Sequence, residues 1–244
     1  MPTTQLFRLS SITLFVLILA GVSCKKKKSV NPFTAAGIAT VDANYSGDLF
    51  HYNIYYNQDN NVDSIILTQT VAGSVYHGYS KFSYSGNTIT VTDDNNGTAT
   101  FSTNANGMIT QIADLAVGAT AITYNGTEVT ELVAYVVDTT KYIWGGNGNI
   151  STGKDNSGNN DTYFFDLKNY GQPGDALRID DFLSYGRSII RTNNLPMQIQ
   201  DANTDELQLF SYTFDGQGRI STLTEKYTEN NLVIDSTVYT YTYY

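Results

Sequence analysis

The pattern that decides the fold is clearest in Leu209-Phe-Ser-Tyr-Thr-Phe-Asp-Gly-Gln-Gly-Arg-Ile-Ser-Thr-Leu-Thr224. Aromatic and aliphatic residues alternate with Ser and Thr on both sides of the central residues Asp215 to Gly218. Successive side chains of a β-strand point to opposite faces, so this alternation predicts two strands that each bury one face. Asp and Gly favour a tight turn between them. The stretch is therefore expected to form a β-hairpin.

The same pattern recurs towards both ends of the chain. Short runs rich in Thr, Tyr, Val, Ile and Phe are separated by clusters of Asn, Asp and Gly. One such cluster is Asn125-Gly126, and Asn-Gly is a strong hairpin signal because both residues accept a positive φ. We therefore predict an all-β fold: an antiparallel meander of about ten to twelve strands that forms a strongly bent sheet or a partly closed barrel.

One stretch departs from this alternation. Asp175 is a plausible helix N-cap, Gly186 is a plausible stop, and the residues between them have a helical spacing of apolar positions. We predict one short helical insertion near 175–186 that packs against an open end of the sheet. Its apolar side would be formed by Leu177, Ile179, Phe182 and Leu183.

The N-terminal segment has the features of an export signal. Arg8 precedes the apolar run Ile12–Ala20, and the single cysteine of the chain, Cys24, follows soon after. A basic start, a short apolar run and small residues are typical of a secretory signal, and the run is shorter than the about 20 residues of a membrane-spanning helix. Three regions are expected: a lipoprotein signal peptide over 1–23, a lipidated Cys24 with a flexible Lys-rich tether over 24–40, and a single β-meander domain over 41–244.

Ordinary signal-peptidase cleavage after Ser23 is the alternative to lipidation of Cys24. The four lysines Lys25–Lys28 would either lie against anionic lipid headgroups or act as a solvated spacer.

Composition excludes several classes of protein. The chain has 244 residues, with 14 Lys and Arg against 23 Asp and Glu, a net charge of −9. An acidic chain does not suit the phosphates of nucleic acid. One cysteine is too few for a disulfide scaffold or a Cys-rich metal site.

Several motifs carry a resemblance to a known family. Tyr212-Thr-Phe-Asp-x-x-Gly-Arg-Ile220 resembles the tyrosine-aspartate repeat of bacterial surface proteins. The order of Tyr163-Phe-Phe-Asp-x-Lys168, a helical insertion and Asn193-Asn-Leu-Pro196, together with the signal and Cys24, resembles uncharacterised Bacteroidetes envelope lipoproteins with a porin-like β-sheet fold. The resemblance implies a fold and an envelope location, and it supplies no catalytic residues.

No catalytic arrangement is evident, and we expect no enzymatic activity. His51 and His77 have no metal-ligand or nucleophile partner at a useful spacing. The carboxylates of Asp180-Asp181 and of Asp205-Glu206 are adjacent in sequence, so their side chains point apart rather than face one sugar.

The best candidate for an ion site is the loop that contains Asp155, Ser157, Asn159 and Asp161. Alternate oxygen-bearing side chains in a tight loop can converge on a hard cation such as Ca²⁺. A solvated hairpin loop without metal is the alternative, because the sixth position of the loop is Asn160 rather than Gly.

Aromatic residues give a second candidate site. Nineteen tyrosines are present, and most are expected to pack on sheet faces. Trp144 stands beside Gly145-Gly146, which would leave its ring open to a sugar, so Trp144 and Tyr142 are the candidate ligand-binding residues.

An integral outer-membrane barrel is disfavoured. The C-terminal run Tyr239-Thr-Tyr-Thr-Tyr-Tyr244 has aromatic alternation, but the positions that alternate back from Tyr244 are threonines. Asn, Asp and Thr also interrupt the strands where a lipid-facing band would be continuous.

The sequence thus predicts a bacterial cell-envelope protein, held at the outer membrane by a lipid on Cys24. It would be a non-catalytic binding or structural module for a glycan or an envelope protein, without nucleic acid or cofactor. The alternative is a calcium-dependent or enzymatic module that uses the 155–161 loop.

Overall fold

The computed structural model describes residues 37–94, 97–114, 118–134 and 138–244. The expected signal peptide, Cys24 and the lysine tether lie outside these residues. No helix in the described part of the chain has the length and hydropathy needed to cross a membrane.

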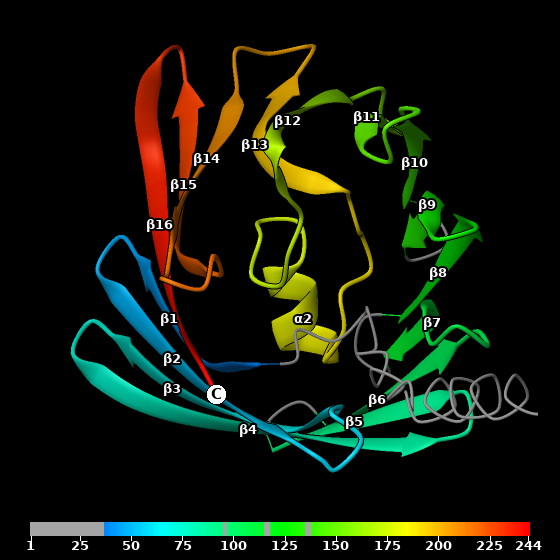
Figure 1. Cartoon of the computed structure of the whole chain (residues 1–244), viewed down its shortest axis with the longest axis vertical. Helices are drawn as coiled ribbons and strands as arrows, with labels where there is room; N and C mark the ends of the chain where they lie inside the picture. Colours follow the sequence, from blue (N-terminus) through cyan, green and yellow to red (C-terminus); the bar gives the residue numbers. More distant parts are fainter. Residues whose placement is uncertain (1–36, 95–96, 115–117, 135–137) are drawn as a thin grey trace, which may run out of the picture. The chain divides into compact units, whose positions relative to one another are not determined.

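Sixteen strands in the described residues form one closed antiparallel barrel (Figure 1). Each strand pairs with its neighbours in sequence, and the last strand pairs with the first. The strands are β1 (Ile38–Tyr45), β2 (Asp48–Tyr56), β3 (Val62–Val71), β4 (Ser74–Ser85), β5 (Thr88–Asp93), β6 (Gly97–Thr103), β7 (Ile109–Asp114), β8 (Gly118–Asn125), β9 (Glu128–Ala134), β10 (Asp138–Trp144), β11 (Ile150–Asp155), β12 (Asn160–Tyr170), β13 (Asn194–Asp201), β14 (Leu207–Phe214), β15 (Ile220–Glu229) and β16 (Leu232–Tyr243).

The predicted all-β antiparallel meander is confirmed, but the expected number of strands was too low. The sheet closes fully because β1 pairs with β16, with Val41 opposite Tyr241 and Ala43 opposite Tyr239. Closure removes the two unpaired edges that an open sheet would expose. β1 begins at Ile38, within the 24–40 range assigned to the tether from the sequence.

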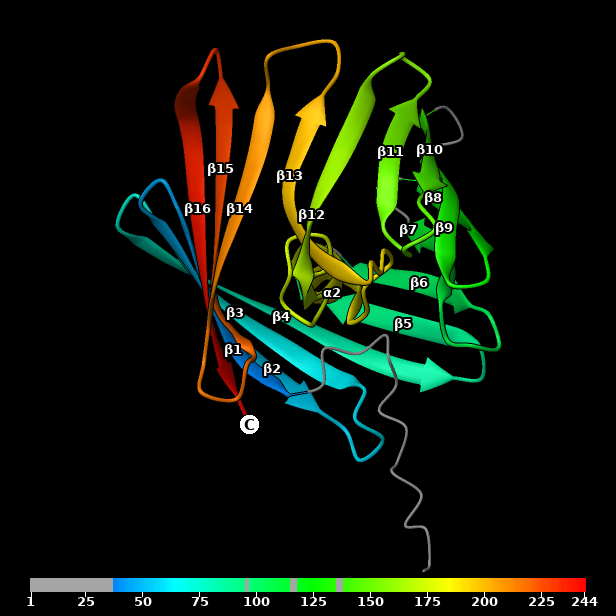
Figure 2. The same ribbon diagram turned by 45° about the horizontal axis from the view of Figure 1, so that its top comes forward.

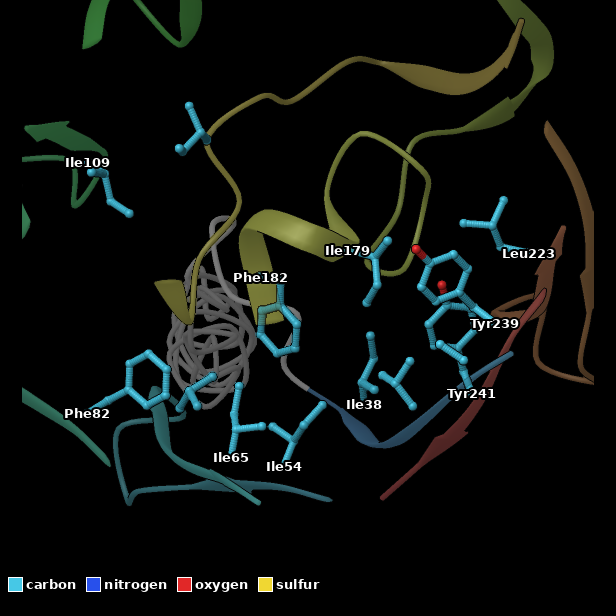
Figure 3. Packing of buried hydrophobic residues seen from close by; sticks show 14 of the residues in the cluster. Ile38, Ile54, Ile65, Phe82, Ile109, Ile179, Phe182, Leu223, Tyr239 and Tyr241 are labelled. Carbon is cyan, nitrogen blue, oxygen red and sulfur yellow. The ribbon is translucent and has the colours of Figure 1, made fainter. Parts of the chain in front are cut away.

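The register places apolar side chains on the inner face of the barrel. Ile54 of β2 lies opposite Ile65 of β3, and both are almost fully buried. The same cluster of buried side chains includes Ile179 and Phe182, which belong to the helix α2 (Ile179–Tyr185). Figure 3 shows these two side chains pointing towards the residues of the strands.

The outer face carries many polar and charged side chains, together with exposed apolar ones such as Val75 and Ile143. Threonines and serines alternate there with the buried positions of the strands. Ion pairs join neighbouring strands on this face: Asp42–His51 at 2.6 Å, Asp63–Lys81 at 2.5 Å and Glu131–Lys141 at 3.6 Å. The buried apolar cluster of the barrel lies on the inner face of the strands.

The insertion between β12 and β13 lies inside the ring of strands (Figures 1 and 2). The predicted helical insertion is confirmed in position, but the helix is shorter than expected, because Asp175 does not cap it. Asp175 accepts hydrogen bonds from the backbone of Gln172 and Leu177, at 3.2 Å each, and so stabilises the preceding turn. Gly186 ends the helix with φ 68°, as predicted.

Buried charges stabilise the insertion and attach it to the barrel. Arg178 lies 3.1 Å from the carboxylate of Asp175, which is fully buried, and donates to the carbonyl of Thr192 at 2.6 Å. Arg187 donates to the carbonyl of Gly107 and lies over the ring of Tyr84. The contacts of Arg178 lie within the insertion, whereas those of Arg187 hold it against β4 and the turn before β7.

Candidate functional site

Trp144 is held by the neighbouring strand. Its indole N–H donates a hydrogen bond of 2.6 Å to the carbonyl of Val129 on β9, and its side chain is half-buried. Tyr142 is on the inner face, where it lies opposite Gly153 of β11. A Cβ at Gly153 would come within 3.4 Å of both Tyr142 and Tyr163, so this glycine leaves room for two aromatic rings.

The predicted calcium loop is a tight turn between β11 and β12. Both carboxylate oxygens of Asp155 accept hydrogen bonds from Asn159, one from its backbone N at 2.9 Å and one from its side chain at 2.8 Å. Ser157 is exposed at the tip of the turn. Asp161 belongs to β12 and pairs with Asp201 of β13 instead. Among the described residues there is no group of three or more His, Cys, Asp or Glu side chains placed to hold a metal ion.

Both histidines lie on the outer face. His51 contacts Asp42 at 2.6 Å, and His77 contacts Thr68 at 3.3 Å. His51 also lines an external groove of about 520 Å³, together with Leu49. His51 and Asp42 both line this groove and contact each other, so we do not assign a ligand to it.

A second pocket, of about 300 Å³, lies at one end of the barrel on the inner face of β12 to β16. We call it the mouth pocket. The register places its main side chains in facing pairs, with Tyr163 opposite Ile199 and Gln208 opposite Tyr227. The side-chain amide of Gln208 donates to the hydroxyl of Tyr227 at 2.6 Å. Its lining is completed by Asp161, Asp201, Glu206, Leu207, Thr228 and Ile234.

The mouth pocket is acidic. Burial raises the pKa of Asp161, and the nearby carboxylates of Asp201 and Asp155 raise it further. Burial also raises the pKa of Tyr227 to about 12, with Glu225 adding to the effect. The phenols therefore stay neutral at physiological pH, and the carboxylates can accept hydrogen bonds from a ligand.

A buried group of acids and phenols lies next to this pocket. Glu225 is two residues from Tyr227 on the same face of β15, opposite Phe210 and Thr237. On the other side, Tyr239 donates to Asp180 of α2 at 3.3 Å. We call the set of Tyr45, Asp180, Glu225 and Tyr239 the acid cluster.

Of the candidate residues taken from the sequence, only Asp161 lines the mouth pocket. Tyr142 lies nearby, across Gly153 from Tyr163. Alternation along the strands could have placed Tyr163 and Tyr227 on inner faces. The pairing of Asp161 with Asp201 could not be predicted from the sequence. It depends on the register between β12 and β13, which are separated by the insertion.

No protein-family model matches the chain, and no curated protein matches it. The solved structures of similar fold include two porin-like proteins. A porin-like protein from Bacteroides uniformis ATCC 8492 aligns with a TM-score of 0.67 at 13% identity, over 87% of this chain and 99% of that one. A porin-like protein from Bacteroides vulgatus ATCC 8482 aligns with a TM-score of 0.53 at 15% identity, over 85% and 98%. The porin-like fold implied by the sequence motifs is thereby confirmed.

Proposed function

We propose that this chain is a non-catalytic binding protein of the bacterial cell envelope that takes a glycan at the mouth pocket. The observation that carries the proposal is this pocket, where aromatic rings and carboxylates converge inside a closed barrel. The porin-like proteins of similar fold and the signal-like N-terminus support the envelope location.

The outer wall supports a barrel surrounded by water rather than lipid. Lys81, Lys141 and Lys226 lie in the middle of β4, β10 and β15, and their neighbours in each strand face inward. A lysine facing lipid at the bilayer midplane costs about 2–4 kcal/mol. We infer that attachment to the membrane depends on Cys24 rather than on the strands.

The filled interior favours binding over conduction. Ile179 and Phe182 pack among the strand side chains, and Arg187 joins the insertion to the wall. A ligand would therefore enter the mouth pocket from one end instead of passing through the barrel.

Sugar recognition fits the chemistry of the mouth pocket. Tyr163 and Tyr227 offer apolar ring faces with hydroxyl tips, which suit the mixed surface of a sugar. Asp161 and Asp201 can accept hydrogen bonds from sugar hydroxyls, and a few convergent polar groups among apolar walls are typical of ligand sites.

The test is calorimetric titration of the purified full chain with a panel of envelope and dietary oligosaccharides. We expect at least one to bind, and Tyr227→Ala to weaken its binding by about tenfold, which corresponds to about 1.4 kcal/mol. Tyr79→Ala on the outer face of β4 is the matched control and should leave binding unchanged. A panel without binders, or equal effects of the two variants, would contradict the proposal.

The calcium-dependent alternative is tested by thermal melts of the full chain with and without Ca²⁺. Asp161 faces Asp201 across the strand pair, so two carboxylates are close enough to repel each other. If Ca²⁺ rather than a glycan stabilises the protein, and Asp161→Ala abolishes the effect, the module is calcium-dependent.

A further inference from the structure

We propose that one end of the barrel rests on the surface of a lipid bilayer, so that the mouth pocket opens away from the membrane. This end is the one where β1 begins and the even-numbered strands end. We call it the apolar end, after its exposed side chains Ile143, Leu167, Tyr170 and Phe214. The inference rests on the attachment at Cys24 proposed above and does not depend on the ligand of the mouth pocket.

The exposed side chains of the apolar end are the first observation. Tyr170 ends β12 and is 79% exposed, the highest value among the large apolar side chains of the described residues. Leu167 of the same strand is 70% exposed. Ile143, next to the end of β10, and Phe214, at the end of β14, belong to the same rim. Aromatic residues and leucine are the side chains that proteins place at the boundary between water and lipid.

A bulge in β12 exposes part of this surface. The register between β12 and β13 shifts between Asp166 and Tyr170, so that residues 167–169 bulge from the ladder. Asp166 fixes the bulge, because it accepts hydrogen bonds from the backbone N of Lys168 at 2.9 Å and from the side chain of Asn169 at 2.6 Å. Lys168 is exposed beside the apolar side chains. An ammonium group next to apolar groups suits the boundary between anionic headgroups and acyl chains.

The end of β12 lies level with the turns around it. Gln172 donates to the carbonyl of Gly218, in the turn between β14 and β15, at 3.4 Å. Asn193 donates to the carbonyl of Asn147, in the turn between β10 and β11, at 2.8 Å. Figure 2 shows the turn between β14 and β15 at the same end of the barrel as the C-terminus. Tyr170 therefore lies at the rim, where a flat surface can reach it.

The two ends of the barrel differ in charge. At the opposite end, seven of the sixteen strands begin or end with Asp or Glu, and Asp201 and Glu206 of the mouth pocket lie there too. At the apolar end only β9, with Glu128, has an acidic terminal residue among the described strands. Asp215 in a turn of this end is paired with Arg219 at 2.8 Å. Anionic headgroups repel the acidic end, so a bilayer favours the apolar end.

The length of chain between Cys24 and the barrel favours the same orientation. Gly37 lies at the apolar end, where it accepts a hydrogen bond from the backbone N of Tyr244 at 2.9 Å. The chain from Cys24 to Gly37 spans at most about 45 Å when fully extended. β16 has 12 residues, so the opposite end lies about 40 Å farther along the wall. An anchored barrel thus reaches the bilayer with its apolar end while the tether is slack.

A second group of exposed apolar side chains lies at the opposite end. Leu232, Val233 and Ile234 belong to the hairpin between β15 and β16. Glu229 and Asp235 flank them, and these carboxylates would have to approach the headgroups if this hairpin met the bilayer. The hairpin therefore supplies a matched control for the apolar end.

The experiment attaches the full chain at Cys24, its single cysteine, to vesicles of phosphatidylcholine and phosphatidylglycerol that contain a brominated phosphatidylcholine. The native acyl group, or a maleimide lipid where the thiol is free, makes the attachment, so the result does not depend on how Cys24 is modified. Trp144→Phe removes the single tryptophan. Tyr170→Trp or Tyr76→Trp then places a fluorescent reporter at the apolar end or at the opposite end.

Bromine quenches a tryptophan only where the ring meets the lipid. We expect the brominated lipid to remove about half of the emission of the reporter at position 170 and to leave the reporter at position 76 unchanged. Leu167→Asp should abolish most of this quenching, and Leu232→Asp, at a leucine of the same exposure, should not alter it. Equal quenching of the two reporters, quenching at position 76 alone, or none at either position would overturn the inference.

A second measurement uses the unmodified sequence, in case Trp144→Phe does not fold. Acetylation of lysines is followed by mass spectrometry on the same attached chain, with vesicles that contain no amine. We expect the bilayer to slow the acetylation of Lys168 several-fold relative to the free chain. Lys154, an exposed residue near the opposite end of β11, should react at the same rate in both states. Equal rates for Lys168 in the two states would contradict the proposed orientation.

Discussion

At the scale of single residues, Glu225 couples stability to pH. Its pKa is about 8 in the folded barrel and near 4.5 in the unfolded chain, because burial disfavours the charged form. Between these values the folded state holds a proton that the unfolded state has released, so stability falls as pH rises from about 4.5 to about 8. We predict that Glu225→Gln raises the melting temperature by several degrees at pH 8 and leaves it unchanged near pH 4.

The measurement is a series of thermal melts from pH 4 to pH 9 on wild type and variant. Part of the slope will remain in the variant, because burial also raises the pKa of Asp181 to about 7. Glu229→Gln serves as the control, since this residue is exposed at the end of β15. Parallel curves for wild type and Glu225→Gln would show that Glu225 does not titrate in this way.

At the scale of elements, the insertion depends on one buried ion pair. Asp175 is fully buried beside Arg178, and burial raises its pKa to about 6, although Arg178 opposes the rise. Arg178→Met leaves this carboxylate without its partner, and we predict a loss of about 3 kcal/mol of unfolding free energy. Urea denaturation at pH 7 measures it.

Two comparisons make this prediction specific. The double variant Asp175→Asn with Arg178→Met should recover part of the loss, because no charge is then left unpaired. Lys141→Met breaks an exposed pair with Glu131 and should cost less than about 1 kcal/mol. An equal loss from Arg178→Met and Lys141→Met would show that the buried pair has no special role in holding the insertion.

The strands also show which parts of the fold could be predicted from the sequence and which could not. The hairpin around Asp215 was predictable because its alternation and turn residues are local. β11 was not, since its run from Ile150 to Asp155 is largely polar and contains Gly153. A glycine at this position leaves room for the rings of Tyr142 and Tyr163 on the flanking strands. β11 is stabilised by its pairing with β10 and β12, and the sequence of β11 alone does not contain that information.

The whole molecule depends on contacts that no local pattern contains. Closure pairs β1 with β16, which lie at opposite ends of the described chain. The acid cluster likewise combines Glu225 of the wall with Asp180 of the insertion. The sequence indicated an inner and an outer face for the strands that it predicted, which is enough to predict the all-β class. It could not supply the number of strands or the residues that meet inside the barrel.

At the scale of the whole molecule, the charged residues on the outer face lead to a prediction of how the protein is attached to the membrane. Charged pairs such as Glu131–Lys141 lie on the outer face, where lipid would make them costly. If only the lipid on Cys24 holds the protein, Cys24→Ser should move it from the membrane pellet to the soluble fraction in an intact fold. Fractionation with immunoblotting measures the distribution, and circular dichroism checks the β-content. Wild type should stay with the membrane after a high-salt wash, because an acyl anchor does not depend on charge. Retention of folded Cys24→Ser in the washed pellet would mean that the strands themselves meet the lipid.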